Sequence, residues 1–146
     1  MAAGLALSAA GDALLVWPQH FVAGMAAFAG AHVAYIAAFG ATPRAPVAGA
    51  ALYAAALAYE RAVPAPGGLR ALVPAYALLL ATMAWRGLAR GVRGALLFAV
   101  SDALLGYSMF AGALPHARAL VMSTYYLAQL AIALSALEPH APPHHA

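Results

Sequence analysis

The chain alternates between long apolar runs and short breaks that contain proline, glycine and arginine. A hydrocarbon core about 30 Å thick is crossed by a helix of about 20 apolar residues, so runs of this order are candidate membrane spans. Proline cannot continue a helix interior, and clusters of proline and glycine mark the connections. The pattern therefore predicts six helices, over residues 2–17, 20–41, 47–62, 69–85, 92–112 and 117–137.

These helices would leave only short connections and one tail. Six spans of about 20 residues use about 120 residues, out of a total of 146. The sequence thus predicts an all-α fold, a polytopic transmembrane helix bundle that forms one domain over residues 1–137. We expect the segment 138–146, which is rich in proline and histidine, to be disordered. Alanine and glycine dominate the spans, which lets helix backbones approach closely in lipid.

The composition agrees with this pattern and excludes other classes. Hydrophobic residues make up 66% of the chain and charged residues 8%, with a mean hydropathy of +0.84. A water-soluble domain carries about a quarter of charged residues, and a disordered chain has low hydrophobicity. The formal charge of +3 comes from scattered arginines, without the basic stripe that binds nucleic acid. Because cysteine is absent, disulfide scaffolds, thiolate metal sites and cysteine nucleophiles are excluded.

Two carboxylates, Asp12 and Asp102, fall inside apolar spans. An ionisable group near the bilayer centre costs about 2.5 kcal/mol or more, so it should face the bundle interior and is a functional candidate. Both aspartates are preceded by a small residue and followed by Ala-Leu-Leu, and they lie four spans apart. This match indicates a weak internal repeat with the same direction through the membrane. A purely structural carboxyl that binds neighbouring helices is the alternative.

Further polar side chains lie near the middle of other predicted spans. His32 and Tyr35 are three residues apart and share a helix face, as do Tyr125 and Gln129, which are four apart. Tyr126 lies at the same depth. Helix pairs in membranes are usually held by fewer polar contacts than this group offers. Their shared depth predicts one functional pocket.

The chemistry of such a pocket follows from its acids. A low-dielectric environment disfavours a charged carboxylate, so a buried Asp can hold a proton at neutral pH and act as a general acid. Two carboxyls can divide proton donation and cation stabilisation, as in hydrolyses that pass through oxocarbenium-like species. The Gly-x-Ser-x-Gly motif of serine hydrolases is absent. Acid–base hydrolysis of a lipid fits these residues, and so does a proton-coupled carrier or channel.

We expect no metal and no cofactor. Zinc held by His32 and both aspartates is a minor alternative, because these residue types are legitimate ligands. No histidine-rich spacing supports it. The sequence leaves open whether copies of the chain associate into a homo-oligomer.

Motifs spread over nearly the whole chain occur in one protein family and in the same order. They are Ser8–Pro18, Phe21–Phe28, His32–Tyr35, Ala38–Gly40, Trp85–Ala89, Gly94–Phe98 with Ser101 and Asp102, Leu114–Arg118 and Thr124–Gln129. On these motifs the chain resembles the lysoplasmalogenase family, also described as the YhhN-like or transmembrane protein 86 group, and in particular its mammalian B branch.

The resemblance implies a multi-pass enzyme of the endoplasmic reticulum membrane. Its substrates would be lysoplasmalogens, whose vinyl-ether bond is hydrolysed to a fatty aldehyde and glycerophosphocholine or glycerophosphoethanolamine. Family members have further helices before this segment, so the resemblance also implies that the chain lacks the N-terminal helices of the family. A noncatalytic truncated form is therefore a further alternative.

The resemblance also assigns residues. The two motif acids of the family correspond to Asp12 and Asp102, which are the expected catalytic residues. The expected substrate-binding residues come from the His-x-x-Tyr and Tyr-Tyr-x-Ala-Gln motifs and are His32, Tyr35, Tyr125, Tyr126 and Gln129.

Overall fold

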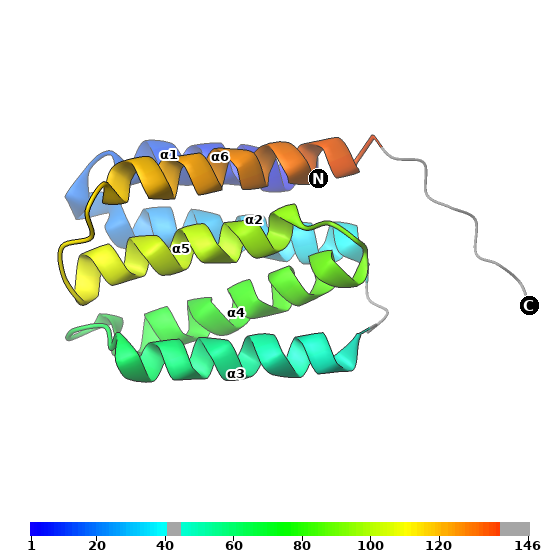
Figure 1. Ribbon diagram of the computed structural model, residues 1–146. Coiled ribbons are helices and arrows are strands. Elements are labelled where there is room, and N and C mark those ends of the chain that lie inside the picture. Colours follow the sequence, from blue (N-terminus) through cyan, green and yellow to red (C-terminus); the bar gives the residue numbers. More distant parts are fainter. Residues whose placement is uncertain (41–44, 138–146) are drawn as a thin grey trace, which may run out of the picture.

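A computed structural model describes residues 1–40 and 45–137. All the secondary structure elements in this part of the chain are helices, as predicted (Figure 1). The helices are α1 (Ala2–Leu15), the short 3-10 helix η1 (Pro18–His20), α2 (Phe21–Phe39), α3 (Pro46–Ala62), α4 (Leu69–Ala89), α5 (Gly94–Phe110) and α6 (Ala117–Ser135). The expectation of a disordered tail over residues 138–146 lies outside the described residues.

The observed bounds follow the apolar pattern closely, with one extension. Helix α4 continues about one turn beyond its predicted end at Trp85, to Ala89. Arg86 does not end it, because a long arginine side chain can lie along an apolar helix while its charged head reaches the polar boundary. Pro74 lies inside the same helix without ending it.

The lengths of the helices fit a membrane protein. Three segments are long and apolar enough to cross a membrane, namely Pro18–Phe39, Leu69–Ala89 and Ala117–Ser135. Helices α1 and α5 are apolar but shorter. Large apolar side chains such as Val33, Leu127 and Leu130 are exposed on the outside of the bundle, where lipid would cover them. These features fit the predicted multi-pass arrangement.

The helices pack in a fixed order around α2, α4 and α5. Helix α2 packs against α1 and α4, α5 packs against α6 and α4, and α3 packs against α4. Figure 1 shows α1 and α6 together on one side of the bundle and α3 on the opposite side, with α4 between α3 and the rest. Helix α4 therefore joins α3 to the two central helices.

Small residues permit this close packing, as the composition predicts. A Cβ atom added at Gly94 would lie 2.8 Å from the carbonyl oxygen of Ala128 and 3.1 Å from the amide nitrogen of Ile132. Helices α5 and α6 thus approach backbone to backbone at this glycine, which is a common device of helix pairs in lipid.

The centre of the bundle is aromatic. The rings of Phe28, Phe98 and Tyr125 pack edge to face, with centroids 5.4–6.1 Å apart, an arrangement that the charge distribution of aromatic rings favours. They come from α2, α5 and α6. We call these three rings the aromatic cluster, and polar side chains lie on both sides of it.

Candidate functional site

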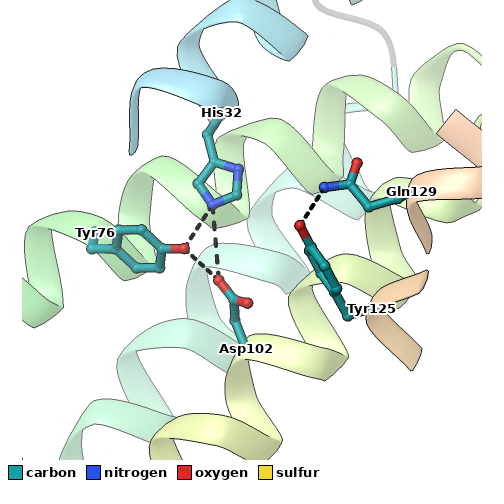
Figure 2. A network of polar contacts seen from close by, with 5 residues as sticks. All are labelled: His32, Tyr76, Asp102, Tyr125 and Gln129. Atoms are coloured by element: carbon teal, nitrogen blue, oxygen red, sulfur yellow. Dashed lines mark hydrogen bonds and ion pairs between the residues drawn. The ribbon is translucent and has the colours of Figure 1, made fainter. Parts of the chain in front are cut away.

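One polar network joins α2, α4 and α5 through three side chains. The Tyr76 hydroxyl donates a hydrogen bond of 2.5 Å to Asp102 Oδ2. The same hydroxyl lies 2.9 Å from His32 Nε2, and His32 Nε2 is 3.8 Å from Asp102 Oδ2. Figure 2 shows the three side chains converging on one point between the helices. We call them the Asp102 network.

Burial separates the members of this network. His32 is fully buried, and its ring packs edge to face on Phe98 at a centroid distance of 5.0 Å. The Asp102 side chain keeps 16% of its surface exposed. Asp102 is therefore a member that a bound molecule can reach, as is the partly exposed Tyr76, whereas His32 can act only through its neighbours.

A cavity of about 260 Å³ lies beside Asp102, between α3, α4 and α5. Its lining is mainly alanine, leucine and valine, and includes Leu52, Ala56, Ala77, Leu80, Ala99 and Ala103. Asp102 and Glu60 are the charged residues among those that line it, with Tyr59 and Tyr76 as phenols. An apolar cavity with a carboxyl group at its wall suits an aliphatic chain that carries a reactive group at a fixed position.

A second network lies around Asp12. The Tyr125 hydroxyl donates a hydrogen bond of 2.8 Å to Asp12 Oδ2 and accepts one of 3.0 Å from Gln129 Nε2. The Gln129 Oε1 atom in turn accepts a hydrogen bond of 2.7 Å from the Tyr35 hydroxyl. This Asp12 network joins α1, α2 and α6. The predicted shared face of Tyr125 and Gln129 is confirmed by their direct bond.

The structure thus differs from the single pocket expected from the shared depth. No hydrogen bond between residues of the described ranges joins the two networks. Phe98 lies between them, because its ring contacts the rings of both His32 and Tyr125, at 5.0 and 5.4 Å. Depth along a span does not fix direction around the helix, so residues at one depth can face two different centres.

Tyr126 is the site candidate that stands outside both networks. Its side chain is 60% exposed, although its ring still contacts that of Tyr125 at 5.4 Å. Consecutive residues on a helix point about 100° apart, so Tyr125 and Tyr126 cannot both face the interior. A substrate contact for Tyr126 stays a prediction.

The zinc alternative finds no support in residues 1–40 and 45–137. These ranges contain no group of three or more His, Cys, Asp or Glu side chains that could hold a metal ion. His32 and Asp102 belong to one network and Asp12 to the other.

Sequence reasoning missed Tyr76, which touches both His32 and Asp102. Helix α4 contains no acidic residue, so nothing in its sequence marked Tyr76 as part of a polar site. The available signal was its place near the middle of an apolar run, two residues after Pro74. That signal is weak, because tyrosine is also common at membrane interfaces.

Comparisons with known proteins agree with one another. A model of the YhhN family matches residues 1–136. Lysoplasmalogenase TMEM86B of Sus scrofa is 52% identical over 90% of this chain and 60% of its own length, and the Homo sapiens protein of that name is 46% identical over 94% and 63%. Lysoplasmalogenase TMEM86A of Homo sapiens is 38% identical over 97% of the chain and 67% of its own length. The chain thus spans about three fifths of the first two relatives. No solved structure matches significantly.

Proposed function

The chain belongs to the YhhN family, and from this premise we propose that it is a membrane-embedded hydrolase of lysoplasmalogens. It would cleave the vinyl-ether bond of alkenylglycerophosphocholine or alkenylglycerophosphoethanolamine. The products would be a fatty aldehyde and glycerophosphocholine or glycerophosphoethanolamine. The relatives named lysoplasmalogenase support this reaction, and the two-acid chemistry expected from the sequence is compatible with it.

The observation that carries the proposal is the position of Asp102 at the wall of an apolar cavity. Its volume of about 260 Å³ is slightly below the usual range of ligand pockets, about 300–1,000 Å³. A space of this size favours one aliphatic chain over two. A single-chain lipid lying along the small residues of α3, α4 and α5 would bring its ether group to the carboxyl of Asp102.

Asp102 would act as the general acid. Its proton would go to the β-carbon of the vinyl ether, whose double-bond electrons form the new C–H bond. The ether oxygen then shares a lone pair with the α-carbon, which gives an oxocarbenium ion. Water attacks the α-carbon and returns a proton to the carboxylate. The bond between the hemiacetal carbon and the glycerol oxygen then breaks. The glycerol oxygen takes the proton of Asp102, the hemiacetal hydroxyl gives its proton back to the carboxylate, and the aldehyde is released.

Asp12 would be the second acid, with an electrostatic role. It does not belong to the described lining of the cavity, so we propose that its negative charge favours the oxocarbenium ion through the low-dielectric aromatic cluster. Tyr125 and Gln129, with Tyr35 behind them, would hold Asp12 in place through their hydrogen bonds.

The membrane of the endoplasmic reticulum is the proposed location, on the strength of the family resemblance and the apolar helices. A fluorescently tagged chain should overlap a marker of that organelle in cells. Exclusive labelling of another membrane would contradict this part of the proposal.

The decisive experiment is an assay for free aldehyde with the purified protein in detergent. We expect aldehyde release from alkenylglycerophosphocholine and none from the saturated ether analogue, because only the vinyl ether has a double bond to protonate. Asp102→Asn should abolish release while the protein still inserts and migrates as the wild type does in gel filtration. Near-normal turnover in Asp102→Asn would overturn the assignment of the acid.

The same assay separates the rival functions. A proton-coupled carrier or channel, for which buried acids and histidine also fit, would release no aldehyde. A noncatalytic truncated form would release none either, but it should co-purify with a full-length partner. Aldehyde release by the isolated chain therefore contradicts both rivals.

A further inference from the structure

The Asp102 network contains one hydroxyl that contacts both of its neighbours. Tyr76 lies 2.5 Å from Asp102 Oδ2 and 2.9 Å from His32 Nε2. A phenol has a single proton to donate and an oxygen that can accept. If the Tyr76 hydroxyl donates its proton to Asp102, its oxygen must accept a hydrogen bond from His32 Nε2–H. The direction of one of these two hydrogen bonds therefore fixes the direction of the other.

The environment of His32 favours this direction. Its ring is fully buried, and Nδ1 has no hydrogen-bond partner among the described residues. With the proton on Nε2, the unpaired Nδ1 is an acceptor; with the proton on Nδ1, it would be a buried N–H without a partner, which is rarer in proteins. We therefore assign the proton of neutral His32 to Nε2, from which it points at Tyr76.

We propose that Tyr76 is a positioning residue that holds the acidic proton of Asp102 on Oδ1, and that His32 acts through Tyr76 by fixing the direction of its hydroxyl. The inference rests on the proposed function, in which Asp102 is the acid. Because Oδ2 accepts the proton of Tyr76, a protonated Asp102 carries its own proton on the other oxygen. No described residue bonds to Oδ1, so the protein leaves this proton free for a bound molecule.

The reverse direction would disable the acid. Asp102 would then carry its proton on Oδ2 and donate it to Tyr76, which would donate to His32 Nε2. The proton would then be held by Tyr76 and would no longer be free for a bound molecule. His32 and Tyr76 thus add no atom to the reaction, and their effect lies in the placement of one hydrogen.

The test uses four variants of the full chain in the aldehyde assay. Tyr76→Phe keeps the ring but removes the hydroxyl, and kcat should fall about 100-fold with KM within about twofold. His32→Gln keeps an N–H near the position of Nε2 and should retain kcat within about threefold. His32→Leu removes the donor and should reduce kcat about tenfold. The double variant Tyr76→Phe/His32→Leu should be no slower than Tyr76→Phe, because His32 acts through Tyr76.

The outcomes distinguish this positioning role from a purely structural role of Tyr76 and His32. If His32→Gln loses as much kcat as His32→Leu, or if the losses multiply in the double variant, the inference is wrong. Thermal unfolding of each variant identifies losses of stability. If one variant does not fold, the kcat values of the variants that do fold are still compared with one another and with the wild type. Absence of aldehyde with the wild-type chain would instead overturn the proposed function, so the two failures are distinguishable.

Discussion

Tyr125 on α6 reaches Asp12 on α1 with a hydrogen bond of 2.8 Å, although 113 positions separate the two residues in the sequence. The first and last helices of the described bundle are thus joined by a buried phenol and a carboxyl. Gln129 supports the same phenol from one turn further along α6. This contact makes a catalytic candidate part of the link between α1 and α6.

Tyr125→Phe should therefore destabilise the fold. The change removes the bond to Asp12 and leaves the carboxyl and the Gln129 amide without this partner, which costs about 1–3 kcal/mol. Thermal unfolding in detergent measures the loss. The matched control is Tyr126→Phe, because Tyr126 is 60% exposed. The unfolding temperature of this variant should equal that of the wild type. Equal effects of the two changes would contradict the structural importance of the Asp12 network.

Asp12→Asn should reduce aldehyde release to background while the protein still inserts. The substitution keeps the shape of the side chain but removes the charge proposed to favour the oxocarbenium ion, so the loss should fall on kcat. The aldehyde assay with saturating alkenylglycerophosphocholine measures the loss. Normal turnover would remove Asp12 from the mechanism and leave Asp102 as a single acid.

Ala77→Leu should narrow the cavity and weaken lipid binding. The added carbons point into a space of about 260 Å³, and displacing about two methylenes of a bound chain at about 0.8 kcal/mol each raises KM about tenfold. Ala75→Leu is the matched control, because Ala75 is exposed and does not line the cavity. An equal rise of KM in both variants would place the lipid chain elsewhere.

Gly94→Ala should separate α5 from α6. The new Cβ would lie 2.8 Å from the carbonyl oxygen of Ala128, and backbone cannot yield as a side chain can, so we expect a loss of about 1–3 kcal/mol. Gly30→Ala is the control, since its Cβ would meet only the Leu7 side chain at 3.4 Å. Because alanine favours helix over glycine, Gly30→Ala should be neutral or slightly stabilising in thermal unfolding.

The apolar pattern was sufficient to predict the fold class and most helix bounds. Proline and glycine breaks mark where a helix must end, and such breaks are local features that the sequence displays directly. The extension of α4 past Trp85 was missed because arginine tolerates both a helix end and a helix interior near the membrane boundary. Local composition alone cannot distinguish the two.

The site was predictable only in part, for a geometric reason. Asp12, His32 and Asp102 could be recognised as candidates because they are ionisable residues inside apolar runs. Burial of such a residue in a membrane costs free energy unless it has a polar partner. The identity of the partner depends on which helices are neighbours, and local sequence patterns do not show which helices pack together. Tyr76 therefore remained unnoticed on α4, and the division of the polar residues by Phe98 became visible only in three dimensions.

Helix α2 supplies a residue to each network, His32 to one and Tyr35 to the other, three positions apart. Both side chains sit on one rigid turn, so a small rotation of α2 about its axis would shift their hydroxyl and imidazole contacts together. The alignment of Asp102 and that of Asp12 would then change in a single movement. Helix α2 therefore links the positions of the two acids through one turn of backbone, although no hydrogen bond in the described part of the chain connects them.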